Sequence, residues 1–253
     1  MFEHGVDKSQ IPVVNIMGVN IAVTDMNRLL DFTRKNIREL SGDYMCVSNV
    51  HTTVTAYDDP EYRKIQNSGI MAIPDGGPLS SVGRKRGCAM ERTTGPSYME
   101  EILKESAEHQ WRHFFYGSVK ETTDLMIRKI EEKYPGTAVA GVCNPPFRPL
   151  SEEEDQEVTR IINESGADFV WIGLGAPKQE IWMYEHQGKI KGFMVGVGAA
   201  FDYLAGNISR APEWMQKANL EWFYRLMQDP KRLFRRYFYT NTKFIWNAVI
   251  RGK

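Results

Sequence analysis

The chain has 253 residues, of which 42% are hydrophobic and 25% are charged, and its formal net charge is zero. This length allows one large domain with a substantial core, and the composition is that of an ordinary globular protein, not a disordered or fibrous one. No apolar run reaches the roughly 18 residues that a spanning helix needs, and the N-terminal MFEHGVDKSQ lacks the apolar core of a signal peptide, so we expect a cytoplasmic chain. Cys46, Cys88 and Cys143 are far apart and odd in number, which predicts reduced thiols and no cysteine pair for a metal.

Short apolar runs alternate with helical patterns along most of the chain. Residues 13–17 and 19–23, separated by Gly18, predict a small hairpin, and Thr24 is placed to cap a helix over residues 25–40. Further strands are predicted at residues 44–48, 70–73, 113–116, 138–142, 169–172 and 193–197, and helices at about 53–66, 97–109, 119–133, 151–165 and 177–187. Strands that alternate with helices indicate βαβ units, and therefore an α/β fold with a Rossmann-like, mainly parallel sheet and helices on both faces.

The C-terminal segment has a different pattern and a different charge. Residues 210–253 contain ten Lys and Arg residues but three Asp and Glu residues, a balance of +7, so the first 209 residues carry −7. Such asymmetry predicts an anionic partner for this segment. We therefore divide the chain into a Rossmann-like domain, residues 1–209, and a helical basic appendage, residues 210–253.

Within this appendage, helices are predicted from Pro212 to about residue 228 and from Asp229-Pro230 onward. On a helical wheel, one side of the last helix is apolar and aromatic, with Phe234, Tyr237, Phe238, Ile245, Ala248 and Val249. The opposite side carries Arg232, Arg235, Arg236 and Lys243. A basic amphipathic helix of this kind is able to lie on an anionic bilayer. The alternative, which the pattern alone favours, is a terminal helix docked on its own domain with a solvated basic face.

Two glycine-rich turns between residues 169 and 210 are the most informative part of the chain. Each follows a short apolar run, as GLGAPKQE and as GVGAAFD, and so lies beyond the carboxyl end of a predicted strand. Ligands of open parallel α/β sheets bind at this edge, where helix N-termini and bare glycine backbone suit phosphate groups. Lys178 and Phe201 occupy the places where a G-x-G-x-x-G dinucleotide motif needs its third glycine, and no P-loop motif occurs. These turns also serve tight chain reversal alone, so they are weak signals by themselves.

Several polar side chains follow the other predicted strands. Asp75 lies at a strand end before Gly76 and Gly77, where it is either a general base or a turn aspartate. Asn49 suits a nucleobase or a sugar hydroxyl, with a helix cap as the alternative. Thr52 and Thr53 either contact phosphate or start the following helix.

Further candidates come from the basic and amide side chains near these turns. Arg92 offers a rigid fork for a diphosphate, with a solvent-facing arginine as the alternative. Lys178 and Gln179 stand at a predicted helix N-terminus. Gln179 is placed for a sugar or uracil edge, and Lys178 for a phosphate, with a solvent-exposed lysine as the alternative. Arg210 belongs either to the cleft wall or to a structural ion pair. No D-x-D sequence occurs, so we expect no metal or other cofactor.

The glycine-rich motif also resembles a known family. GLGAPKQEIW, followed by VGVGAAFDYLAGNISRAPEWMQKANLEWFYRL, is similar to the WecG/TagA/CpsF family of bacterial glycosyltransferases, and VSNVHTTV, IPDGGPLS and ERTTGPSYME agree upstream. The resemblance covers about residues 14–236.

The resemblance implies an inverting transferase. Asp75 would be the catalytic base, Arg92, Lys178 and helix N-termini would stabilise the leaving UDP, and Gln179 would bind substrate. The donor would be a UDP-sugar, commonly of N-acetylmannosamine or a related hexose. The acceptor would be a polyprenyl-diphosphate-linked saccharide used for teichoic acid, enterobacterial-type antigen or capsule.

The resemblance also favours the membrane interpretation of the C-terminal segment. Arg232, Arg235 and Arg236 would face the lipid diphosphate or the anionic inner face of the cell membrane. We expect no nucleic-acid partner, and a homo-oligomer is left open. The alternatives are a non-catalytic nucleotide-sugar-binding regulatory protein and a dinucleotide oxidoreductase, which the missing third glycine argues against.

Overall fold

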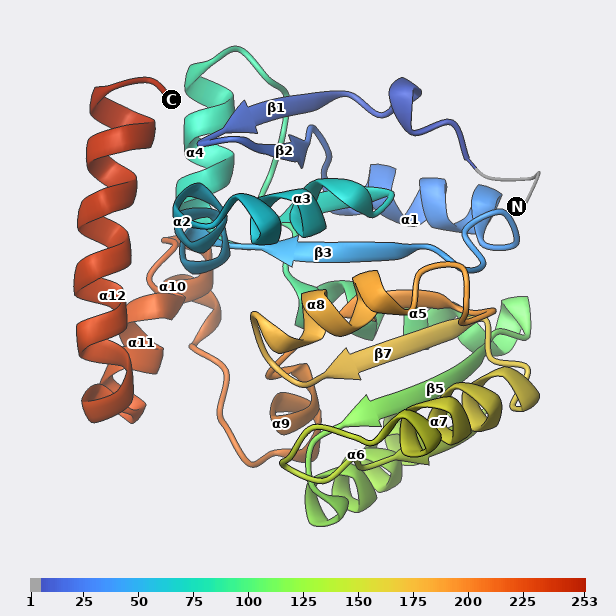
Figure 1. Ribbon diagram of the computed structural model, residues 1–253. Helices are drawn as coiled ribbons and strands as arrows, with labels where there is room; N and C mark the ends of the chain where they lie inside the picture. Colours follow the sequence, from blue (N-terminus) through green and yellow to red (C-terminus); the bar gives the residue numbers. More distant parts are fainter. Residues whose placement is uncertain (1–5) are drawn as a thin grey trace.

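A computed structural model describes residues 6–253 apart from the side chains of Lys217 and Arg232, and in it eight strands form one sheet (Figure 1). The strands are β1 (Val13–Ile16), β2 (Val19–Ala22), β3 (Tyr44–Ser48), β4 (Met71–Pro74), β5 (Arg112–Gly117), β6 (Ala138–Cys143), β7 (Phe169–Gly173) and β8 (Phe193–Gly196). Their order is β1-β2-β4-β3-β8-β7-β5-β6, and the β1–β2 hairpin is antiparallel while the other pairs are parallel. The predicted Rossmann-like α/β sheet and its N-terminal hairpin are confirmed.

Helices cover both faces of the sheet, as predicted. On one face, α2 (Val50–Asp58), α3 (Pro60–Ser68), α7 (Glu152–Glu164) and α8 (Lys178–Glu185) contribute to one apolar cluster. On the other face, α1 (Met26–Asn36), α5 (Gly95–His109), α6 (Lys120–Lys133) and α9 (Ala200–Ala205) contribute to a second. The remaining helical elements are a 3-10 turn (Lys8–Gln10), α4 (Gly77–Lys85), α10 (Glu213–Lys217), α11 (Glu221–Gln228), α12 (Pro230–Phe244) and a π-helical end (Ile245–Ile250).

The central strands are buried on both faces, as parallel strands between two helical layers must be. Every residue of β3 and β8 is buried. The buried polar side chains of the sheet include His113 of β5, which is fully buried. Its Nδ1 accepts a hydrogen bond from Trp171 Nε1 at 3.0 Å, so its Nε2 carries the proton and faces Ser106 Oγ at 2.6 Å. His113 is therefore a satisfied core residue.

Several helix boundaries differ from the predictions, each for a local reason. Asp25, not Thr24, caps α1, because its side chain accepts a hydrogen bond from the Arg28 backbone N–H. The single helix predicted at 53–66 is two helices, because Asp59 ends α2 in an extended conformation and caps α3 directly before Pro60.

Two helices, α4 and α9, were not predicted from the sequence, and both begin in or directly after glycine-rich segments. α4 begins at Gly77, with Pro78 in its first turn, where a missing N–H costs nothing. α9 begins at Ala200 directly after the second glycine-rich turn. The helix predicted from Pro212 to residue 228 is broken into α10 and α11, and Asn219 between them has a left-handed φ of 59°.

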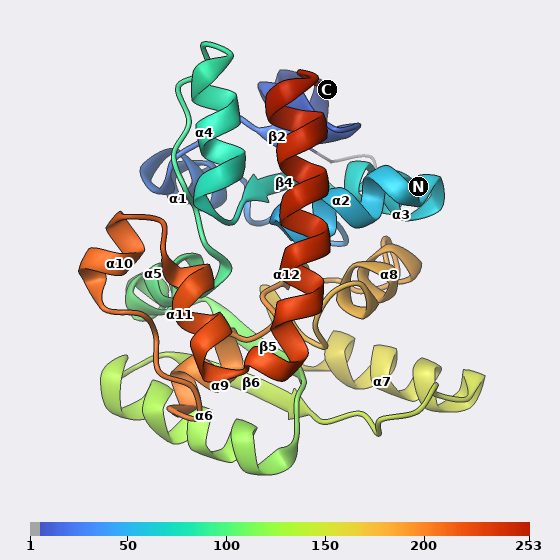
Figure 2. The ribbon, with the colours of Figure 1, turned by 90° about the vertical axis from the view of Figure 1, so that its left-hand side faces the viewer.

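The C-terminal helices pack against the Rossmann-like core (Figure 2). α12 contacts α2, and Phe244 and Ala248 belong to the apolar cluster of that face. Arg86, after α4, donates to the carbonyl oxygens of Ala248 at 3.4 Å and Lys253 at 2.7 Å. The predicted single apolar side of the last helix is divided: Ala248 faces the protein, whereas Phe238 remains 68% exposed. The division of the chain at residue 210 stays a prediction.

Candidate active site

The carboxyl ends of β3 and β4 bring Asn49 and Asp75 together. Ser48 pairs with Pro74 in the parallel register, and the Asp75 N–H donates to the Ser48 carbonyl oxygen at 2.7 Å. In the sheet, β4 lies next to β3 on one side, and β8 followed by β7 lies on the other side of β3. Asn49 and Asp75 therefore lie at the position where the strand order reverses, which is where ligands of open α/β sheets bind.

Asn49 has two roles in this arrangement. Its side-chain oxygen accepts hydrogen bonds from the backbone N–H groups of His51 and Thr52, so it caps α2. The Asn49 side chain also lies close to the carboxylate of Asp75 and lowers the pKa of Asp75. The helix-cap interpretation is thus confirmed, and the same side chain lies beside the proposed base.

Thr52 and Thr53, for which the sequence predicts either contact with phosphate or the start of a helix, both lie near the start of α2. The Thr52 hydroxyl is held by the capping box, because it accepts from the Asn49 N–H at 2.9 Å. The Thr53 hydroxyl is fully buried and has no hydrogen-bond partner within residues 6–253. Both start the helix, and their contact with substrate stays a prediction.

Arg92 reaches the site from the segment after α4. The Thr93 N–H donates to the Pro74 carbonyl oxygen at 2.9 Å, which fixes this segment against the end of β4. The Arg92 guanidinium donates to the Gln216 carbonyl oxygen at 3.2 Å and forms an ion pair with Glu221 of α11. Arg92 is thus a partly buried, paired side chain and not a solvent-facing one.

The electrostatic surroundings of Asp75 suit a general base. The pKa of Asp75 is about 6: burial raises it most and Glu221 also raises it, while Arg92, Arg225 and Asn49 lower it. A carboxyl with a pKa near 6 is ionised at neutral pH and is more basic than an ordinary aspartate.

A cavity of about 500 Å³ opens in front of Asp75. One wall is α4, and the other is formed by α11 and α12, which face it across the carboxyl edge of the sheet (Figure 2). The size is typical of a small-molecule site. The lining side chains include Trp222, Tyr237, Phe244 and Val249, so most of the wall is apolar.

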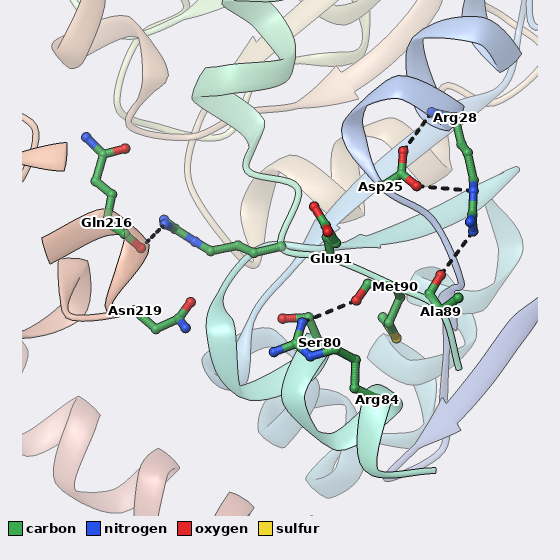
Figure 3. Close-up of a pocket in the computed structure, with 10 residues that line it drawn as sticks. Asp25, Arg28, Ser80, Arg84, Ala89, Met90, Glu91, Gln216 and Asn219 are labelled. Carbon is green, nitrogen blue, oxygen red and sulfur yellow. Dashed lines mark hydrogen bonds and ion pairs between the residues drawn. The ribbon is translucent and has the colours of Figure 1, made fainter. Parts of the chain in front are cut away.

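A second cavity, of about 670 Å³, adjoins the first and shares Arg92 and Asn219 with it (Figure 3). Two of its arginines, Arg28 and Arg84, donate hydrogen bonds to backbone carbonyl oxygens. Arg28 pairs with Asp25 at 3.1 Å and donates to the Ala89 carbonyl oxygen at 3.0 Å. Asp75 lines the first cavity and not the second.

The first glycine-rich turn is braced from inside by Gln179. This side chain is 4% exposed, and its oxygen accepts from the Gly175 N–H at 3.2 Å while its nitrogen donates to Glu180 at 2.9 Å. Glu180 is fully buried, and burial raises its pKa. Lys178, in contrast, is exposed. Substrate binding by Gln179 and Lys178 stays a prediction.

The remaining basic candidates are distributed around the C-terminal helices. Arg210 donates to Ser97 Oγ at 3.0 Å and lies 3.7 Å from Glu100 and 4.0 Å from Glu221, so it forms structural ion pairs near the site. Arg235 is exposed, and Arg236 is half-buried beside His51. The side chain of Arg232 lies outside the described residues.

Sequence reasoning missed the contribution of α11. Glu221 and Arg225 both act electrostatically on Asp75, and Asn219 lines both cavities. A Glu–Arg pair four residues apart on an amphipathic helix is typical of an exposed surface, so no local pattern indicated that these two side chains turn inward.

No group of three or more His, Cys, Asp or Glu side chains in the described part of the chain is arranged to hold a metal ion. The expectation of a metal-independent reaction stays a prediction. Among the same residues, no helix has the length and hydropathy needed to cross a bilayer.

A half-buried carboxylate at the end of β4, close to an amide and to two arginines, has the surroundings that a general base needs. The chain belongs to the glycosyl transferase WecG/TagA/CpsF family, whose model matches residues 14–253. The resemblance inferred from the sequence motifs is confirmed, and with it the class of glycosyltransferase.

Curated relatives carry the same activity name. The chain is 28% identical over 221 residues to N-acetylglucosaminyldiphosphoundecaprenol N-acetyl-beta-D-mannosaminyltransferase of Bacillus subtilis strain 168, covering 86% of this chain and 83% of the relative. The enzyme of the same name from Staphylococcus aureus strain MW2 is 25% identical over 231 residues, covering 90% of this chain and 89% of the relative.

Proposed function

We propose that this enzyme transfers N-acetylmannosamine from its UDP derivative to N-acetylglucosamine linked through a diphosphate to a polyprenol. The observation that carries the proposal is the position of Asp75, which lines a cavity together with Arg92, lies close enough to Arg225 to feel its charge, and has a pKa of about 6. The names of the relatives supply the sugar and the acceptor.

The proposed reaction is a single displacement with inversion. Asp75 takes the proton of the acceptor hydroxyl as its oxygen forms a bond to the anomeric carbon of the donor. The bond from that carbon to the UDP oxygen breaks on the opposite side, and the electron pair leaves with UDP. Arg92, Arg225 and exposed Lys178 are the cations near the edge of the sheet that stabilise the diphosphate charge.

We infer that the enzyme works at the inner face of the cell membrane, because the proposed acceptor is linked to a lipid. In support, the C-terminal helices expose large apolar side chains, including Trp214 at 65%, Phe238 at 68% and Ile250 at 63%. Arg235 on α12 is exposed as well. Exposed aromatic and basic side chains on one group of helices are typical of a surface that lies on an anionic bilayer.

Incubation of the full chain with UDP-N-acetylmannosamine and farnesyl-diphosphate-linked N-acetylglucosamine tests the proposal. We expect release of UDP and a disaccharide lipid detected by mass spectrometry. A panel of other UDP-hexoses should give slower transfer. Tight UDP binding without transfer of any sugar would instead support the non-catalytic, nucleotide-sugar-binding interpretation.

A further inference from the structure

A groove leads from Asp75 to the outer surface of the molecule between α4 and α12. We call it the α4–α12 groove. On α4 its lining residues are Pro78, Ser81, Val82 and Lys85. These are spaced by three, four and seven residues, so they form one face of the helix. The facing wall includes Tyr237, Asn241, Phe244, Ile245 and Val249 of the last helix, and Figure 2 shows α4 beside the C-terminal part of that helix.

The inner and outer ends of this groove differ in chemistry. Asp75 and Gly77 lie at the inner end, where α4 begins. Lys85 is the last residue of α4, and eight steps of an α-helix advance it by about 12 Å. Between these ends, Val82, Phe244 and Val249 give the groove apolar walls.

Two cations line the groove, and they differ in their pairing. Arg92 is in an ion pair with Glu221. Lys85 is exposed, and within residues 6–253 its ammonium group makes no hydrogen bond or ion pair. An unpaired ammonium group beside apolar walls suits a ligand that carries an anionic group next to a hydrocarbon chain.

We propose that the α4–α12 groove binds the diphosphate and the first isoprene units of the acceptor lipid, with Lys85 contacting the diphosphate. This inference rests on the proposed function. With the acceptor hydroxyl at Asp75, a hexose followed by two phosphates is of comparable length to the interval between Asp75 and Lys85. The hydrocarbon chain then follows the apolar wall at Val249 and leaves beside Trp246 and Ile250, which are 52% and 63% exposed.

The acceptor rather than the donor fits this groove for a chemical reason. The ribose and diphosphate of UDP are polar, and the apolar wall formed by Phe244, Ile245 and Val249 offers them no hydrogen bonds. A prenyl chain gains by burying hydrocarbon against the same wall, at about 0.8 kcal/mol for each buried methylene group.

Steady-state kinetics with two short acceptors test the groove. The probes are N-acetylglucosamine diphosphate esterified with methyl and with farnesyl. We expect Lys85→Ala to raise the KM for both acceptors by about tenfold, the size of one charge-assisted contact, while kcat and the KM for the UDP-sugar stay within about twofold. Lys133→Ala removes an exposed lysine of α6, far from the groove, and serves as the control.

The apolar wall is tested separately with Val249→Asp. In the wild type the farnesyl acceptor should have the lower KM, and this variant should lose most of that preference. Val119→Asp changes an exposed valine before α6 and should retain it. Unchanged acceptor KM values in Lys85→Ala and Val249→Asp, measured while the wild type transfers sugar, would overturn the groove assignment. Failure of the wild type to transfer sugar to either acceptor would overturn the proposed function instead.

Discussion

Glu221 of α11 is paired with Arg92, and both side chains lie beside the carboxylate of Asp75. The pair ties a C-terminal helix to the segment that follows α4, so the end of the chain helps to build the site. It also neutralises a guanidinium that the proposed mechanism assigns to the UDP diphosphate. A bound donor must therefore compete with Glu221 for Arg92.

Glu221→Gln should release Arg92 for the donor. We expect UDP to bind roughly three- to tenfold more tightly, the size of one partly exposed charge-assisted contact, as measured by isothermal titration calorimetry. Because Glu221 also raises the pKa of Asp75, the acid limb of the kcat/KM profile should move to lower pH. Glu108→Gln, on the exposed side of α5, is the control. Unchanged UDP affinity would show that Arg92 does not contact the donor.

Asp75→Asn should remove the general base and keep the shape of the site. We expect kcat to fall by about 10²–10⁴-fold, with UDP affinity nearly unchanged. In the wild type, activity should decline as the pH falls below about 6, where Asp75 becomes protonated. Turnover close to wild type in Asp75→Asn would remove Asp75 from its catalytic role.

The raised pKa of Asp75 also predicts how the stability of the folded protein depends on pH. The pKa of Asp75 is about 6 in the folded protein and about 4 in an unfolded chain. The unfolded state therefore releases the proton first, and stability from this group is lost as the pH rises from about 4 to about 6. Asp75→Asn should raise the Tm above pH 6 and change it little below pH 4. Equal Tm differences at pH 4 and pH 8 in differential scanning calorimetry would contradict a raised pKa.

The strand-end residues were predictable from the sequence because each follows an apolar run directly. Asn49 and Asp75 follow β3 and β4 in this way, and parallel strands bring their carboxyl ends to one edge. The position of α11, whose side chains close one side of the site, was not predictable. Glu221 and Arg225 lie on a helix with the periodicity of a surface element, and only the turn at Asn219 and the packing of α12 on α2 direct them toward Asp75.

Sequence patterns also left the role of buried polar side chains open. Gln179 looks like a free amide at a helix start, but its two ends are engaged by Gly175 and Glu180. The hydrogen-bond partners of such a side chain depend on distances across the fold. The spacing of residues in the sequence does not reveal these distances.

The reaction should proceed without a divalent metal. The sequence has no D-x-D motif, and Arg92 and Arg225 supply positive charge near Asp75. Activity after exhaustive treatment with EDTA should remain within about twofold of the untreated enzyme, a change too small for the loss of a Lewis acid worth several kcal/mol. Loss of activity with EDTA and its recovery with Mg²⁺ or Mn²⁺ would show that a metal carries the leaving-group charge.

The basic side chains of α12 should attract the enzyme to anionic membranes. Lys231 and Arg235 are both exposed, and each basic residue near the surface contributes about 1 kcal/mol. Lys231→Glu combined with Arg235→Glu should weaken binding to phosphatidylglycerol vesicles by at least about 20-fold at low salt, and added salt should reduce the difference. Charge reversal is a cleaner test than removal of the helix, because Phe244 and Ala248 belong to the apolar core. Lys133→Glu on α6 reverses one exposed charge elsewhere and should bind vesicles like the wild type. Vesicle binding that is unaffected by the α12 substitutions would show that this helix is only a packed terminal element.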